Sequence, residues 1–227
     1  MFKELIAIFI LLFTHEMGHF LVSKKFKWKV KKIVFYPFGG LTIYEDVIDK
    51  PLMEEFLVTI SGPIFQTLIF LIFLYLKNNY YVSEYFYNII KNFNYGILLL
   101  NLLPIVPLDG SKILNILFNK FISFKKSYIL TLYISISMLI IFIGYIKNDS
   151  SYYMLIIFLI YEIINYIRYR KFIYNKFILE KKLYKNNFKK IKKIKNINNM
   201  HRNKRHLFYE NKKYITEKQM LKKTKFY

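Results

Sequence analysis

Apolar residues fall into five long runs along the chain, and polar residues collect in the stretches between them. Each run approaches the ~20 residues that a helix needs to cross the hydrocarbon core of a membrane. The runs are Leu5 to Val22, Phe56 to Leu76, about Tyr95 to Leu108 continuing into Phe118, about Tyr128 to Ile146, and about Tyr152 to Ile167. The pattern predicts an all-α polytopic membrane protein with about five transmembrane helices.

The lysine content of the connections alternates between high and low along the chain. The counts are seven Lys in 24–55, two in 77–92, four in 112–127, one in 147–151, and 21 Lys and Arg after residue 167. Connections rich in Lys and Arg stay in the cytoplasm. Five spans would therefore place 24–55, 112–127 and the C-terminal segment inside the cell and the N-terminus outside.

The connection after the first run has a pattern of its own. Its sequence "KWKVKKIVFYPFGGLTIYE" carries β-branched and aromatic residues such as Val30, Ile33 and Phe35 on both sides of a Pro-Phe-Gly-Gly turn. Such a pattern favours a short β-hairpin or re-entrant strand region at the membrane surface. The alternative is an ordinary loop of mixed polar and apolar residues.

Charge divides the chain into two parts. The net charge is +22, and residues 168–227 alone hold 21 Lys and Arg against 3 Asp and Glu. We therefore expect a membrane-embedded domain at 1–167 and a basic cytoplasmic tail at 168–227, which begins as an amphipathic helix. Lysines near a membrane surface are attracted to anionic lipid. We expect the tail to contact that leaflet or a partner, and we expect no specific nucleic acid because the tail has no RNA-binding signature.

The first apolar run contains three ionisable residues in the sequence "HEMGH". His15 and His19 are four residues apart, which places both imidazoles on one face of a helix. Two imidazoles can hold a zinc ion, and Glu16 beside them can take a proton from water. The alternative is a pair of buried histidines satisfied by carbonyl groups. Cysteine is absent from the chain, so a metal must be bound by histidine and carboxylate.

A catalytic zinc needs a third protein ligand. The possible ligands are Glu162 in the fifth run, His201 and His206 in the tail, and Asp109 in "NLLPIVPLDG". The predicted topology places Asp109 at the same membrane depth as the histidines. Pro104 and Pro107 break the helix just before it, and irregular backbone at that depth is tolerated where it lines a wet cavity. The alternative is a kinked span in which Asp109 caps the next helix.

Several motifs in order resemble one known family. "HEMGH", "PFGG", "KPLMEEF" with "SGP", and "NLLPIVPLDG" are similar to the motifs of the site-2 protease family of intramembrane zinc metalloproteases. The resemblance covers about Leu5 to Arg170. It implies one Zn²⁺ per chain, with His15, His19 and Asp109 as ligands and Glu16 as the catalytic acid and base.

The resemblance also implies a substrate-binding region and a class of substrate. The residues concerned are Asn101, Pro107, Phe38, Gly39 and Gly40. The last three belong to a strand region that could hold an unfolded substrate by strand addition. In the sporulation branch of the family, the substrate is the membrane-tethered pro-segment of a sigma factor. That branch acts in the mother-cell membrane around the forespore, and it leaves room for inhibitory membrane partners and an oligomer.

Two departures from the family pattern qualify these expectations. Close members have a further span before the His-Glu-x-x-His helix, so an upstream span is either lost here or omitted by the start site. They also end in a cytoplasmic CBS domain that senses nucleotide, and the residues after Arg168 are too few for a complete one. A competing interpretation is a catalytically inactive metal-binding or scaffold protein of the membrane with a basic tail, although the presence of Glu16 argues against it.

Overall fold

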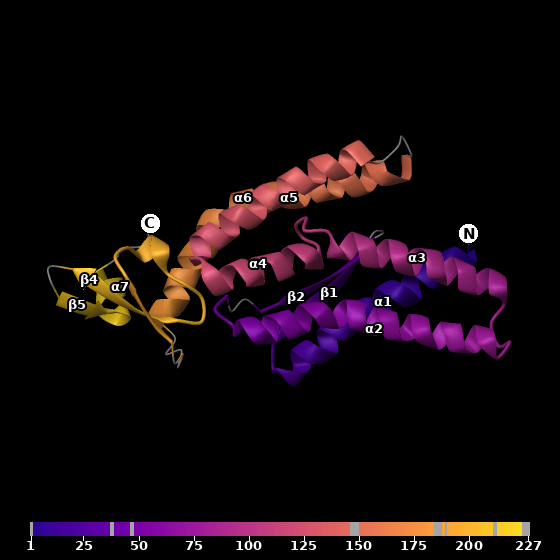
Figure 1. The fold of residues 1–227 in the computed structure, drawn as a ribbon, viewed down its shortest axis with the longest axis horizontal. Coiled ribbons are helices and arrows are strands. Elements are labelled where there is room, and N and C mark those ends of the chain that lie inside the picture. The colour runs from indigo at the N-terminus through magenta and orange to yellow at the C-terminus, as the bar shows by residue number, and fades with distance from the viewer. Residues whose placement is uncertain are drawn as a thin grey trace. The chain divides into compact units, whose positions relative to one another are not determined.

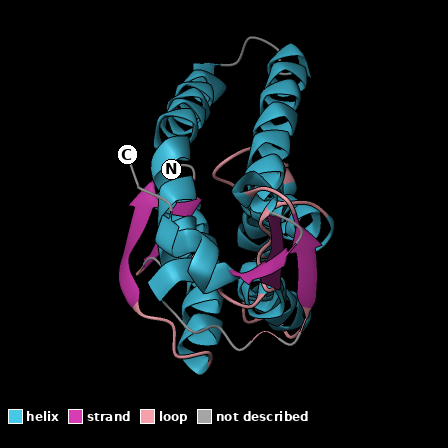
Figure 2. Ribbon diagram, turned by 90° about the vertical axis from the view of Figure 1, so that its left-hand side faces the viewer, coloured by secondary structure: helices cyan, strands magenta, loops and turns pink. Residues whose placement is uncertain are grey.

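The computed structural model describes residues 2–36, 39–45, 48–145, 150–183, 188, 190–210 and 213–223. Within these residues the chain is mostly helical and has two small sheets (Figures 1 and 2). It forms two compact units. The first comprises Met1–Glu45, Phe56–Leu103 and Leu108–Gly110, and the second comprises Asp46–Glu55, Pro104–Pro107 and Ser111–Tyr227.

Three long helices build the first unit. They are α1 (Phe2–Lys25), α2 (Leu52–Asn78) and α3 (Glu84–Leu102). Ala7 and Leu11 of α1 and Ile90 of α3 are fully buried, and they pack against apolar side chains of α2 and α3 such as Phe70. Long apolar runs form helices in a membrane because a helix satisfies all of its own backbone hydrogen bonds.

The predicted hairpin after the first helix is confirmed. Strands β1 (Val30–Tyr36) and β2 (Gly39–Tyr44) pair antiparallel, with Tyr36 opposite Gly39 and Val34 opposite Leu41. The register is irregular between Val30 and Lys32. Phe38 is outside the described residues.

The second unit contains helices α5 and α6 and most of helix α4. The part of α4 that belongs to this unit begins at Ser111. The bounds are α4 Asp109–Phe121, α5 Phe124–Tyr145 and α6 Ser150–Leu183. Helices α5 and α6 lie side by side (Figure 1). The rings of Tyr128 and Tyr166 stack with centroids 3.9 Å apart, and the Tyr128 hydroxyl donates to the Tyr166 carbonyl at 2.7 Å.

The prediction of an all-α protein with a basic helical tail is corrected in the second half of the tail, which forms strands. The tail continues α6 to Leu183, but it then forms a second sheet from β3 (Ile191–Ile194), β4 (Arg205–Glu210) and β5 (Lys213–Thr216). β3 is parallel to β4, and β5 is antiparallel to it. A 3₁₀ turn at Ile197–Asn199 and helix α7 (Glu217–Lys223) complete it.

A core of its own explains why the tail folds instead of remaining a polar extension. Phe177 at the end of α6, Phe208 of β4 and Leu221 of α7 are fully buried together, and Met200 and Phe124 join them. His206 and Phe208 are buried and alternate with more accessible neighbours along β4, which is the period-two pattern of a half-buried strand. The predicted boundary at residue 167 lies inside α6 and stays a prediction.

One helix boundary differs clearly from that predicted. The third run starts at Glu84 instead of about Tyr95, because Ser83 caps the helix by accepting from the Phe86 amide at 3.3 Å; most of the predicted 77–92 loop is therefore helix. The predicted break is present between Leu102 and Asp109. Among the described residues, α1, α2 and α5 are long and apolar enough to span a membrane, so the count of five stays a prediction.

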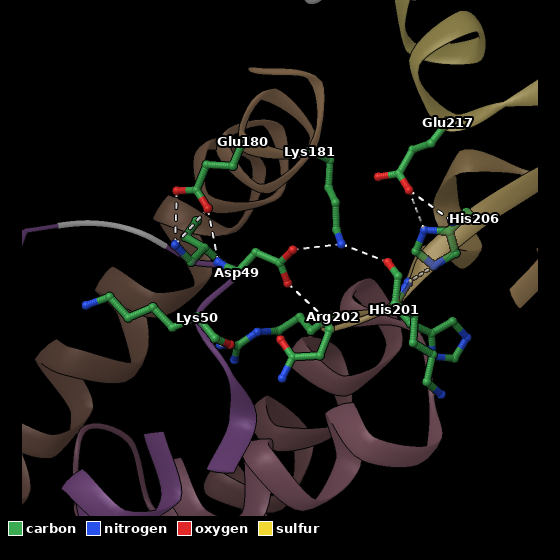
Figure 3. A network of polar contacts seen from close by, with 11 residues as sticks. Asp49, Lys50, Glu180, Lys181, His201, Arg202, His206 and Glu217 are labelled. Atoms are coloured by element: carbon green, nitrogen blue, oxygen red, sulfur yellow. Dashed lines mark hydrogen bonds and ion pairs between the residues drawn. The ribbon is translucent and has the colours of Figure 1, made fainter. Parts of the chain in front are cut away.

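A buried polar network ties the Ile48–Glu55 segment to the tail within the second unit (Figure 3). The carboxylate of Glu180 accepts from the amides of Ile48 and Asp49 at 2.8 and 3.0 Å. Lys181 Nζ lies 2.7 Å from Asp49 Oδ2, and both side chains are almost inaccessible to solvent. Arg202 Nη2 pairs with Glu55 Oε2 at 2.6 Å. Two ion pairs, of which Lys181–Asp49 is almost inaccessible to solvent, therefore join the tail to the start of α2 and the residues just before it.

We expect Lys181→Met to destabilise the second unit by about 3–5 kcal/mol, because it leaves the Asp49 carboxylate buried without its cation. Chemical denaturation of the full chain in detergent measures this loss. Lys171→Met removes an exposed lysine from the same helix and should change stability by less than about 0.5 kcal/mol. The double variant Asp49→Leu/Lys181→Met should recover much of the loss, since no unpaired charge remains. Equal effects of the Lys171 and Lys181 variants would contradict the argument.

Candidate metal centre

Helix α1 presents His15, Glu16 and His19 on consecutive turns. All three side chains are buried, with residue exposures of 2%, 3% and 4%. The four-residue spacing brings His15 Nε2 and His19 Nε2 to 3.2 Å, with the imidazole planes at 79°. The ligand atoms of these three residues lie within 4.8 Å of one another.

Asp109 meets the two imidazoles at the first turn of α4. Its Oδ2 lies 3.0 Å from His15 Nε2 and 3.0 Å from His19 Nε2, and all three residues belong to the first unit. Pro104 and Pro107 interrupt the helical backbone just before it, so that the chain restarts as α4 at the carboxylate. Of the four possible third ligands, the structure therefore brings Asp109 to the histidines.

The other three possible ligands lie in the second unit. His206 has its own partners, because its Nδ1 lies 3.3 Å from Glu217 Oε2 and its Nε2 accepts from the His201 amide at 2.9 Å (Figure 3). His201 Nε2 lies 2.9 Å from Lys192 Nζ. Glu162 is in α6.

The outer nitrogen of each imidazole faces a fixed acceptor. His15 Nδ1 lies 2.9 Å from Gln66 Oε1, and His19 Nδ1 lies 2.7 Å from the Val58 carbonyl. Carbonyl oxygens only accept, so Nδ1 donates in both rings, and in the neutral form of each ring the Nε2 lone pair faces Asp109. Gln66 is itself oriented by Asn94, whose Oδ1 accepts from Gln66 Nε2 at 3.0 Å. Such outer partners fix the tautomer and orientation of metal-binding histidines.

The donor set fits a zinc ion. Two neutral imidazole nitrogens and one carboxylate oxygen form the set of three protein ligands that a catalytic zinc uses. Bond lengths of about 2.0–2.1 Å in a tetrahedron separate ligand atoms by roughly 3.3 Å, and the three separations here are 3.0, 3.0 and 3.2 Å. Gly62 of α2 leaves room for the two imidazoles, because a Cβ at that position would overlap the His19 ring.

Glu16 is held by the hairpin instead of by the histidine cluster. Thr42 Oγ1 of β2 donates to Glu16 Oε2 at 2.6 Å. Gly40 of the same strand lies against the Glu16 side chain, and a Cβ there would overlap it. The hairpin therefore determines where the carboxylate points. From the sequence, Gly40 was expected to bind substrate. Its contact with Glu16 is a further reason for a glycine at this position, which the sequence did not reveal.

Of the remaining predicted substrate residues, Asn101 and Gly39 belong to the first unit. Asn101 is half-buried in the last turn of α3, and Gly39 begins β2 opposite Tyr36. Pro107 belongs to the second unit, and Phe38 is outside the described residues. Their contact with substrate stays a prediction.

Gln66, Asn94 and Thr42 were missed by the sequence analysis. Gln66 had a visible signal, because it stands in the middle of an apolar run that carries no formal charge, and a buried amide needs partners. Asn94 lay within one turn of the predicted start of the third run. Nothing in the sequence distinguished Thr42 from any other strand threonine.

We expect Gln66→Leu to weaken zinc binding about 10–100-fold, because His15 Nδ1 loses the acceptor that fixes its tautomer. Competition with a zinc chelator of known affinity measures the change. Thr67→Val is the matched control, since Thr67 lies one position further along α2 and its hydroxyl donates to the Pro63 carbonyl in its own helix. If the Gln66 variant bound zinc like the wild type, the imidazole would not depend on this amide.

Parts of the chain are similar to known proteins. Residues 3–95 match the model of peptidase family M50. Stage IV sporulation protein FB of Bacillus subtilis is 31% identical over 81% of this chain and 65% of its own length. Zinc metalloprotease MJ0392 of Methanocaldococcus jannaschii is 30% identical over 53% of this chain and 37% of its own length. The chain thus spans less than two thirds of these relatives.

The fold is also similar to a solved structure. The site-2 protease from Methanocaldococcus jannaschii superimposes with a TM-score of 0.58 over 70% of this chain and 75% of that one, at 23% sequence identity.

Proposed function

We propose that the chain is a zinc-dependent intramembrane endopeptidase of peptidase family M50, the site-2 proteases. The observation that carries the proposal is the convergence of His15, His19 and Asp109, with their atoms 3.0–3.2 Å apart, beside the buried Glu16. Apolar helices long enough to span a membrane accompany this site.

His15, His19 and Asp109 would hold the zinc. When bound, zinc polarises a peptide carbonyl and lowers the pKa of water toward ~7. The protein contributes a preorganised set of donors, because Gln66 and the Val58 carbonyl fix the orientation of both imidazoles, with Nδ1 toward these acceptors and Nε2 toward Asp109.

Glu16 would act as the general base and then as the general acid. Its Oε2 is engaged by Thr42, so Oε1 is the oxygen that would accept a proton from the attacking water. As the peptide C–N bond breaks, the same oxygen would return that proton to the leaving amine nitrogen. Positioned proton transfer of this kind contributes about 10²–10⁴-fold to a rate.

The hairpin would hold the substrate in an extended conformation. A helical substrate shields its own amides by i to i−4 hydrogen bonds, so it must unwind before attack. An added strand would pair with the free edge of the two-stranded sheet. β2 carries both Gly40 and Thr42 to Glu16. Gly39, Asn101 and Pro107 would shape the region around the scissile bond.

The substrate would be a membrane-tethered protein cut near the cytoplasmic face. The alternating lysine content of the connections supports a cytoplasmic position for the site and the tail. The similarity to stage IV sporulation protein FB supports the pro-segment of a sporulation sigma factor as the substrate and the mother-cell membrane as the location. Inhibitory membrane partners, self-association and contact of the basic tail with anionic lipid belong to the same proposal.

Co-expression with a membrane-tethered pro-sigma fragment tests the proposal. We expect cleavage of the fragment by the full chain, inhibition by a zinc chelator, and recovery when zinc is added back to purified protein in detergent. A second tethered protein without the pro-segment separates general proteolysis from this substrate class. Cleavage that persists after complete zinc removal would contradict the metalloprotease mechanism.

A further inference from the structure

The second unit contains a hollow of about 750 Å³ between the tail sheet and the chain that joins α4 to α5. It is separate from the His15, His19 and Asp109 cluster, none of which lines it. Lysine and tyrosine side chains of the lining come from three places in the sequence. They are Lys126, Lys192, Lys193, Lys195, Tyr209 and Tyr214.

The lining of the hollow is strongly positive. It holds four lysines, and no Asp or Glu is found among the described residues that line it. Buried His201 also lines it, and burial together with Lys192, Lys204 and His206 lowers the pKa of His201 to about 4. Like charges crowded at one site repel each other unless an anion joins them. The hollow is therefore suited to a negatively charged ligand.

Polar groups suited to a phosphate ester accompany the lysines. Ser123 is 4% exposed, and its Oγ has no hydrogen-bond partner in the part of the chain that the structure describes. Ser123, Asn196 and Asn199 all line the hollow. A buried hydroxyl without a partner is unfavourable, and a phosphate or glycerol oxygen would satisfy it.

The hollow lies at the end of a candidate membrane span. Phe121, Ile122, Ser123 and Lys126 line it, and α5 begins at Phe124 and is apolar enough to cross a membrane. The first turn of such a span lies at the depth of the lipid headgroups. Phe121 is 68% exposed, so its apolar ring is available to contact acyl chains. This placement favours a lipid headgroup over a ligand from solution.

We propose that the hollow formed by the α4–α5 junction and the tail sheet binds the phosphate headgroup of an anionic phospholipid. The lysines pair with the phosphate, Ser123 and the asparagines bond to its ester and glycerol oxygens, and Phe121 contacts the acyl chains. The tail would thereby be seated on the membrane at a defined site instead of by diffuse charge alone.

Titration of the detergent-solubilised full chain with short-chain lipids tests the proposal. The probes are dihexanoylphosphatidylglycerol and, as the neutral control, dihexanoylphosphatidylcholine. Lys126→Gln/Lys195→Gln changes two exposed lining lysines. Because each lysine near the headgroup contributes a factor of roughly five, we expect the Kd for phosphatidylglycerol to rise about 25-fold. We also expect the lipid to raise the pKa of His201, measured by NMR.

The matched control removes the same charge elsewhere in the tail. Lys218→Gln/Lys222→Gln alters two exposed lysines of α7 that do not line the hollow, and it should change the Kd by less than about twofold. Equal weakening by both pairs would overturn the proposal in favour of diffuse attraction. Equal affinity for phosphatidylcholine would also overturn it. Tighter binding of inorganic phosphate or ATP than of phosphatidylglycerol would assign the hollow to a soluble anion instead.

Discussion

Glu16→Gln is expected to abolish substrate cleavage while the protein still binds zinc. The amide keeps the size of the carboxylate and can still accept the hydrogen bond from Thr42, but it cannot accept a proton from water. Loss of the general base should lower the cleavage rate by about 10²–10⁴-fold. Single-turnover cleavage of the tethered substrate, with metal content measured on the same sample, gives both results.

Thr42→Val tests whether cleavage depends on how the Glu16 carboxylate is positioned, and not only on its presence. It keeps Glu16 but removes the hydroxyl that holds Oε2, so we expect it to reduce the cleavage rate much less than Glu16→Gln does. Both variants should retain one zinc per chain, because the three proposed ligands are unchanged. Cleavage by the Glu16→Gln variant at the wild-type rate would show that another group moves the proton.

The convergence of the two α1 histidines with Asp109 could be predicted because the signals are local and chemically unusual. An i, i+4 histidine pair inside an apolar run is costly unless it is paired or bound to a metal, and the proline-broken segment before Asp109 offered a carboxylate at matching depth. The hairpin was predicted correctly from alternation around the Pro-Phe-Gly-Gly turn. In these cases a few neighbouring residues contain the whole signal.

Other parts of the site depend on contacts between distant segments. Thr42 reaches Glu16, and Gln66 reaches both His15 and Asn94, only because the helices and the hairpin pack as they do. The tail was misjudged for a related reason. Its lysines dominate the composition, but Phe177, Phe208 and Leu221 form a small core, and the Asp49–Lys181 pair joins it to a segment before α2. The lysines suggested contact with a membrane surface or a partner, whereas the buried apolar residues explain why the segment after α6 folds into a sheet.

Asp109→Ala should remove zinc from the purified protein, and with it all cleavage. The carboxylate oxygen that lies 3.0 Å from both Nε2 atoms is lost, which leaves two ligands where a catalytic site needs three. The loss of affinity should exceed the 10–100-fold that removal of an outer partner costs. Metal analysis of the detergent-purified chain is the direct measurement.

Glu16→Gln is the matched control for this loss, since it neutralises a buried carboxylate on the same helix as both histidines but leaves the three donors intact. Zinc lost only from the Asp109 variant, at unchanged thermal stability without added metal, would identify Asp109 as the third ligand. Zinc lost equally from both would mean that either carboxylate supports the ion, and full zinc retention by Asp109→Ala would exclude Asp109 from the set. The contrast between the two carboxylates therefore assigns ligand and base separately, which neither variant does alone.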